Sequence, residues 1–209
     1  AAAADTAFAV WCSGNATFYF DYGSAPSAGG TYSGQIVTKV WKGGDITSSP
    51  DNSYPAWSKD IYFDRCKHVV FQPAFANVKP KSFNRWFSDC SSLTDITGLE
   101  YLDTSEATTM AGMFVCCYKL NELNVNSFDT SKVTTMVLMF YFCTSLKSLD
   151  VSNFDTRNVT DMGEMFYYCN NLRELDLTNF DTRSVAEMGG MFKNCYNLKT
   201  IYVGDMWSN

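Results

Sequence analysis

A Met-Phe pair recurs at a step of 26 residues through the second half of the chain, and this period constrains the fold more than any other feature. The pairs are Met113-Phe114, Met139-Phe140, Met165-Phe166 and Met191-Phe192. A cysteine and an Asp-Thr pair keep the same step. A sequence period between about 20 and 50 residues is typical of coils stacked in a solenoid. The period therefore predicts stacked coils and favours surface recognition over chemistry.

Each unit begins with a short alternating pattern, seen well in residues 146–152. Leu149 and Val151 alternate with the polar residues Ser148, Asp150 and Ser152. Alternation of this kind predicts a short strand with its apolar side chains turned inward. The Asp-Thr pair that follows is expected to form a polar turn, because Asp and Thr side chains bond nearby backbone groups. The four aspartates of these pairs are Asp103, Asp129, Asp155 and Asp181.

The second part of each unit has the spacing of a helix. Val159, Met162, Phe166 and Cys169 lie at offsets of 0, 3, 7 and 10 residues, which places them on one helical face. Two pairs of polar residues have the spacing expected at a helix N-terminus, and the second pair matches a capping box. These pairs are Asn158 with Asp161, and Ser184 with Glu187.

Residues 1–65 lack the period and are expected to form a β-rich cap. Residues 8–12 and 16–22 predict a hairpin, and residues 35–41 predict a third strand. Residues 68–71 and 200–203 predict the first and last strands of the stack. One extra residue beside Gly98 predicts a bulge.

Together these patterns predict an α/β solenoid in two parts. Residues 1–65 would form the β-rich N-terminal cap, and residues 66–209 would form about five coils of 26 residues. The expected architecture is a leucine-rich-repeat-like, right-handed stack, with short parallel strands on one face and short helices on the other.

Five of the eight cysteines occupy the same place in successive units and should form a buried column of free thiols. These are Cys90, Cys117, Cys143, Cys169 and Cys195. The other three are Cys12, Cys66 and Cys116. The spacing leaves open a disulfide between Cys12 and Cys66.

The unit L-x-x-L-D-V-S-x-F-D-T-x-x-V-T-x-M-x-x-M-F-x-x-C resembles the 26-residue repeat of the BspA-like bacterial surface leucine-rich repeat proteins. The resemblance covers about residues 83–203, with Trp86 and Ala107 departing from it in the first regular unit. It implies a secreted or surface-anchored protein, held at an outer membrane or cell wall, that takes part in adhesion and binds host proteins. It supplies no catalytic residues. No intact signal peptide precedes the units, because the Ala1-Ala2-Ala3-Ala4 start lacks a basic and a long apolar region.

Residues that carry chemistry are sparse, so no enzyme and no cofactor are expected. His68 is the single histidine, Cys116-Cys117 lacks the C-x-x-C spacing, and no glycine-rich phosphate loop is present. The aspartate column raises the alternative of Ca²⁺ binding, although the flanking threonines favour turns and no metal site is assigned.

Charge and hydropathy limit the kinds of partner that the chain is expected to have. Residues 86–209 carry 8 basic and 16 acidic side chains, a balance of −8 that argues against nucleic acid. No apolar run approaches the roughly 18 residues of a transmembrane segment.

The outward side chains of the predicted strands are the candidate site for a protein ligand, including extracellular-matrix or mucosal proteins of a host. The residues are Glu122, Asn124, Asp150, Ser152, Glu174, Asp176 and Tyr202. One alternative is a carbohydrate-binding module that stacks sugars on aromatic residues of the N-terminal part, namely Trp11, Tyr22, Tyr32, Trp41, Tyr54 and Trp57. Another is a structural spacer that self-associates through its last coil.

Overall fold

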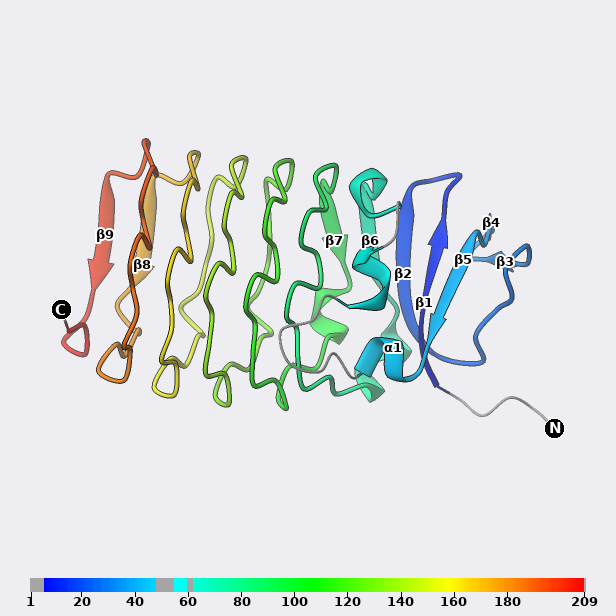
Figure 1. Cartoon of the computed structure of the whole chain (residues 1–209), viewed down its shortest axis with the longest axis horizontal. Coiled ribbons are helices and arrows are strands. Elements are labelled where there is room, and N and C mark those ends of the chain that lie inside the picture. Colours follow the sequence, from blue (N-terminus) through cyan, green and yellow to red (C-terminus); the bar gives the residue numbers. More distant parts are fainter. Residues whose placement is uncertain (1–5, 48–54, 60–61, 209) are drawn as a thin grey trace.

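The structure is a computed structural model that describes residues 6–47, 55–59 and 62–208. It is an elongated body in which strands from the N-terminal part lie at one end, and the 26-residue units follow one another toward the other end (Figure 1).

A five-stranded mixed sheet forms the N-terminal end, in the order β5-β1-β2-β6-β7. β1 (Thr6–Cys12) and β2 (Thr17–Gly23) form the predicted antiparallel hairpin, and β5 (Lys39–Lys42) pairs with the other edge of β1. The predicted third strand is split, because its first residues form β4 (Gln35–Ile36), which pairs only with β3 (Thr31–Tyr32).

Parallel pairing joins this hairpin to the units. β2 lies parallel to β6 (His68–Phe71), and β6 lies parallel to β7 (Asp95–Thr97), one 27-residue step further along the chain. The same sheet therefore runs across the boundary drawn at residue 65. At the C-terminal end, β8 (Glu174–Leu177) and β9 (Thr200–Val203) form a separate parallel pair, so the last predicted strand is confirmed.

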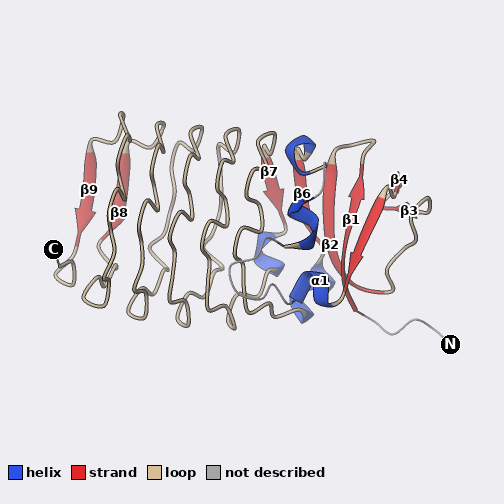
Figure 2. Ribbon diagram, in the orientation of Figure 1, coloured by secondary structure: helices blue, strands red, loops and turns tan. Residues whose placement is uncertain are grey.

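The prediction of an α/β solenoid is wrong, because the expected layer of helices is absent from the described residues. The helical elements are α1 (Gly44–Thr47), η1 (Ala56–Lys59), η2 (Phe63–Arg65), η3 (Pro73–Asn77) and η4 (Leu99–Tyr101). None exceeds five residues, and none lies after residue 101. The chain is mostly β, with small open sheets and long runs of turns (Figure 2).

Backbone hydrogen bonding explains why the helical spacing gives no helix. In the third regular unit, Met139 N–H bonds Met136 O within the unit, whereas Phe140 N–H bonds Met165 O of the next unit. Leu138 and Phe142 also donate to the next unit and have positive φ angles of 60° and 57°. A helix would use every N–H internally and keep φ negative. Tight turns bonded sideways therefore replace it.

The predicted helix N-termini fail for the same reason. Asp161 Oδ1 accepts from Gly163 N–H at 2.9 Å, and Glu187 Oε1 accepts from Gly189 N–H at 2.6 Å. Asp161 and Glu187 also form a parallel bridge with each other. Their side chains close local turns, and the capping box at Ser184 is not formed.

The Met-Phe pairs nevertheless fill the interior as expected. Met139, Phe140, Met165 and Phe166 are fully buried. The phenylalanine rings stack from unit to unit, and Phe140 and Phe166 have centroids 5.6 Å apart. The cysteine column lies beside them, with Cys143 Sγ 3.2 Å from Phe114 O. All eight cysteines are free, so the alternative of a Cys12–Cys66 disulfide is excluded.

The Asp-Thr turns are confirmed. Asp129 Oδ1 accepts from Ser131 N–H at 2.9 Å, and Asp155 and Asp181 repeat this bond with the residue two positions on. The buried Thr130 joins two units, since its Oγ1 donates to Asp155 O at 3.0 Å and accepts from Asp155 N–H at 2.8 Å. The aspartates thus serve as turn residues.

The extra residue near Gly98 is accommodated by the 3-10 turn η4 and not by a β-bulge. Gly98 precedes this turn with a φ of 72°, a left-handed conformation that favours glycine.

Candidate functional site

Four consecutive units present a polar face on the side where a strand was predicted in each. Only β8 and β9 are strands there, so the strand predicted over residues 146–152 is not formed. This polar face consists of the outward side chains of residues 122–126, 148–152, 174–178 and 200–202. Lys199 N–H donates to Arg173 O at 2.8 Å, and β8 and β9 pair with Asp176 opposite Tyr202. Lys147 N–H donates to Asn121 O at 3.4 Å, which sets the first two segments beside each other.

Strict alternation of burial orients these side chains outward. Leu149, Val151, Leu175 and Leu177 are buried, whereas the polar residues between them are exposed. All seven residues predicted to contact a partner are exposed, as expected: Glu122, Asn124, Asp150, Ser152, Glu174, Asp176 and Tyr202. Buried leucine and valine side chains anchor the first three segments, whereas all four residues of β9 are exposed, with Ile201 at 37% and Val203 at 48%. The first three segments therefore display their polar groups in fixed register.

One column of side chains lies near the end of each of the first three segments, just before the chain turns. Asn124, Asp150 and Asp176 each accept a hydrogen bond through Oδ1 from the N–H two residues on, at 3.0 Å in every case. Hydrogen bonds from the side chain and backbone of Ser152 lower the pKa of Asp150, and those from the backbone and side chain of Thr178 lower the pKa of Asp176. Both groups are therefore negatively charged at neutral pH.

The face is hollowed between its segments. One hollow of about 320 Å³ lies between Glu122, Asn124, Ser148 and Asp150. A second of about 580 Å³ runs from residues 96–100 to Asn124 and Asn126. Side chains of a bound peptide or protein loop can enter such hollows.

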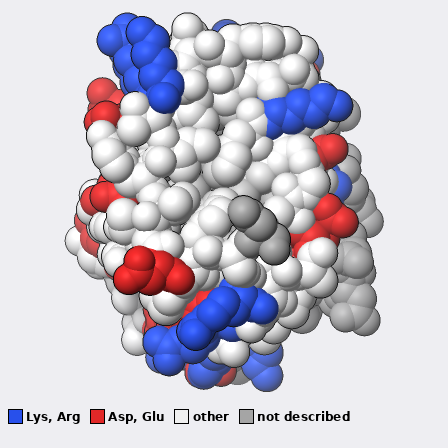
Figure 3. Space-filling model, turned by 90° about the vertical axis from the view of Figure 1, so that its left-hand side faces the viewer, with Lys and Arg blue, Asp and Glu red and all other residues white. Residues whose placement is uncertain are grey.

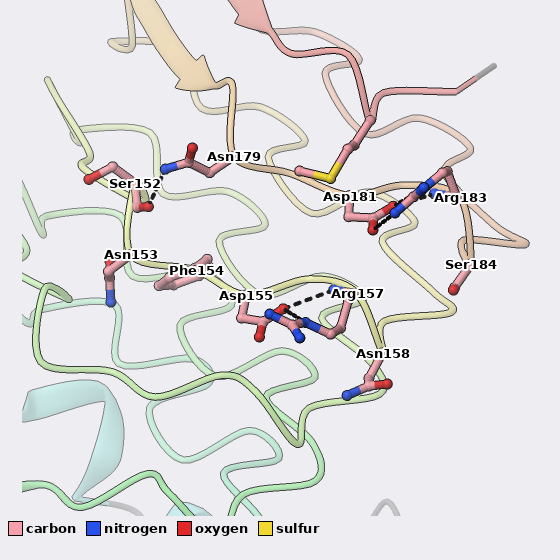
Figure 4. A pocket seen from close by; sticks show the side chains of 11 residues that line it. Ser152, Asn153, Phe154, Asp155, Arg157, Asn158, Asn179, Asp181, Arg183 and Ser184 are labelled. Carbon is pink, nitrogen blue, oxygen red and sulfur yellow. Dashed lines mark hydrogen bonds and ion pairs between the residues drawn. The ribbon is translucent and has the colours of Figure 1, made fainter.

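A larger hollow of about 820 Å³ adjoins the face at the Asp-Thr corner and shares Ser152 with it (Figure 4). Arg157 Nε lies 2.9 Å from Asp155 Oδ1, and Arg183 Nη2 lies 2.7 Å from Asp181 Oδ2. Asn179 Nδ2 donates to Ser152 O at 2.6 Å and closes one side. The bond from Arg183 lowers the pKa of Asp181 to about 2.

Sequence reasoning missed this corner hollow. Arg157 and Arg183 each follow an aspartate by two residues at the 26-residue step, a repeated Asp-Thr-Arg signal that was available in the sequence. Each arginine neutralises the aspartate beside it. The corner therefore offers both hydrogen-bond donors and hydrogen-bond acceptors without a strong net charge.

The aromatic residues of the N-terminal part mostly lie in the core. Trp11, Trp41 and Trp57 are buried, which removes them from any sugar-stacking surface. Tyr22 is exposed, and Tyr32 is half-buried and hydrogen-bonds Asp21. Tyr54 lies outside the described residues.

His68 lies on strand β6, as predicted. Its Nδ1 is 2.7 Å from Asp95 Oδ2 across the parallel pair β6–β7. Within the described residues, no group of three or more His, Cys, Asp or Glu side chains could hold a metal ion.

Residues 81–205 match the family described as "Mycoplasma protein of unknown function, DUF285". The chain belongs to this family. Comparison with curated proteins and with solved structures gave no match. Among the residues that the structure describes, no helix is long and apolar enough to cross a membrane. The family description gives no activity, and the polar face is the feature of the chain that points to a function.

Proposed function

We propose that this protein is a non-enzymatic recognition module that binds a protein ligand through its polar face. The observation that carries the proposal is the display of exposed carboxylates, hydroxyls and amides at equivalent positions of adjacent segments, the first three of which are anchored by buried side chains. Such a surface needs little ordering when a partner binds, which favours affinity.

The charge of the face favours a ligand with basic residues. Glu122, Asp150, Glu174 and Asp176 are exposed, and the first two line the smaller hollow between their segments. Complementary charge across an interface raises the association rate and selects the partner. Arg and Lys side chains of a ligand are the natural counterparts of these carboxylates.

The resemblance to BspA-like surface proteins supports a secreted or cell-surface setting and a host extracellular-matrix or mucosal protein as ligand. Burial of three tryptophans weighs against the carbohydrate alternative based on N-terminal aromatic residues.

Binding to immobilised, purified matrix and mucosal proteins, measured by surface plasmon resonance, tests the proposal. Replacing both Asp150 and Asp176 by Lys should abolish binding to the ligand found. Replacing both by Asn should weaken binding at least tenfold while preserving the turns, because Asn124 forms the same turn in the preceding unit.

Asp64 supplies the matched control, since it is exposed on η2 far from the polar face in the sequence. Asp64→Lys should leave the affinity unchanged. Unchanged affinity in both Asp150/Asp176 variants, or absence of binding to every protein tested, would remove the polar face as the binding surface.

A further inference from the structure

A separate basic hollow of about 690 Å³ lies where the last three segments of the polar face begin. Its lining consists of Lys147, Asn171, Arg173, Asn197 and Lys199. It thus contains three cationic side chains, two carboxamides and no carboxylate. The three cations stand at the same place in successive units, 26 residues apart.

Backbone bonding and the shared hollow place these cations in a row. Lys199 N–H donates to Arg173 O at 2.8 Å, and Lys147 lines the same hollow while its own N–H donates to Asn121 O of the preceding unit. Neighbouring parallel segments lie about 4.8 Å apart, so the outer two cations of the row start about 10 Å from each other. The C-terminal end of the molecule shows basic side chains at its upper left and again along its lower edge, with acidic side chains between them (Figure 3).

The three cations have no partner among the described residues. Lys147, Arg173 and Lys199 are exposed and form no ion pair there. Other basic residues of the stack are paired, such as Lys132 with Glu106 and Arg183 with Asp181. Neighbouring like charges repel one another, and an anion bound between them relieves that repulsion.

The two carboxamides add neutral hydrogen-bonding groups to the hollow. Asn197 Nδ2 donates to Asn170 O at 2.7 Å, which fixes its side chain and leaves its Oδ1 as an acceptor. Asn171 occupies the equivalent place in the preceding unit. Amides of this kind bond the hydroxyl groups of sugars.

We propose that the basic hollow binds an acidic oligosaccharide. Sulfate or carboxylate groups of the sugar would pair with Lys147, Arg173 and Lys199, and its hydroxyls would bond Asn171 and Asn197. The guanidinium of Arg173 suits this role because it can bond two oxygens of one anionic group at once.

Two features favour a saccharide over a nucleic acid. Glu174 and Asp176 follow Arg173 directly on the exposed side, and they would repel a backbone with a charge on every nucleotide. The lining residues include no aromatic ring on which a base could stack. An acidic sugar chain spaces its charges with neutral hydroxylated groups, which match the mixed lining.

Isothermal titration of the whole chain tests the inference with defined probes. Oligosaccharides of κ-carrageenan carry sulfate on alternate sugars and those of hyaluronan carry carboxylate on alternate sugars, so the two arms identify the anionic group. Binding of either one, with no binding of neutral dextran, is the expected result. Equal binding of oligothymidylate, equal affinity for inorganic sulfate alone, or no binding of either acidic sugar would overturn the inference.

Point variants tie the binding to the hollow. Arg173→Gln and Lys199→Gln should each weaken binding about tenfold, since each removes a charged hydrogen bond. Asn171→Ala should weaken binding of the sugar and leave the melting temperature of the protein unchanged. Lys81→Gln makes the same charge change at an exposed site outside the hollow and should have no effect.

Equal losses in Lys81→Gln and Arg173→Gln would contradict a local site. The inference is independent of the protein-binding proposal, because the variant in which Asp150 and Asp176 are replaced by Asn should bind the acidic sugar at least as tightly as the unaltered protein does.

Discussion

The rings of Phe114 and Phe140 lie parallel, with an interplanar angle of 3° and centroids 5.7 Å apart. The stack continues to Phe87 on one side and to Phe192 on the other. Each 26-residue unit contributes one ring, so no unit completes this part of the interior alone.

Replacing Phe140 by Ala should therefore reduce the free energy of unfolding by about 3–5 kcal/mol, because the ring is fully buried between two others. Urea denaturation measures the change. Phe192→Ala is the matched control, since Phe192 is only partly buried and stacks on Phe166 alone. A smaller loss is expected there, and equal losses would contradict a continuous ring stack.

The burial pattern could be predicted from the sequence far better than the backbone conformation. Val159, Met162, Phe166 and Cys169 are all buried, as the 3-4 spacing indicates. That spacing fits a helix, but it also fits successive tight turns whose alternate N–H groups bond the next unit. Periodicity reports which side chains face inward and not which hydrogen bonds close the turn. The helices were therefore predicted wrongly while the core was predicted correctly.

The same distinction holds at the candidate site. Alternation placed Asp150 and Asp176 on the surface correctly, because it needs only the local pleat. The corner hollow around Arg157 and Arg183 and the basic hollow around Arg173 depend on how the ends of different units meet. The way in which these ends meet is seen only in the three-dimensional structure.

Thr130→Val should destabilise the fold by about 1–3 kcal/mol. Valine keeps the shape of threonine but removes the hydroxyl, which both donates to Asp155 O and accepts from Asp155 N–H in a buried place. Thr134→Val is the control, because Thr134 is exposed and its loss should cost less than about 0.5 kcal/mol. Chemical denaturation of both variants decides the matter, and similar costs would argue against a bridging role for Thr130.

Gly98→Ala should destabilise the junction between β7 and the regular units by more than about 2 kcal/mol. The residue has a φ of 72°, and an added Cβ would overlap the carbonyl oxygen of Phe71. Gly29→Ala separates these two causes, because Gly29 has a φ of 83° with open space around it. Its cost should stay near about 1 kcal/mol, as judged by thermal unfolding. Equal costs at the two positions would show that the contact with Phe71 is unimportant.

The free energy of unfolding should fall at acidic pH, over a range that depends on the protonation of Asp181. Hydrogen bonds from the Arg183 side chain and backbone hold the pKa of Asp181 at about 2, below its usual 3.8. A carboxyl whose pKa falls on folding contributes stability that is complete above pH 3.8 and is lost as the pH drops through about 2. Unfolding by urea, followed between pH 5 and 2, should show declining stability. Asp181→Asn should flatten this decline, whereas Asp64→Asn, at a carboxyl with no such arginine partner among the described residues, should leave the profile unchanged. An identical profile in Asp181→Asn and the unaltered protein would contradict the Asp181–Arg183 pair as a source of the acid sensitivity.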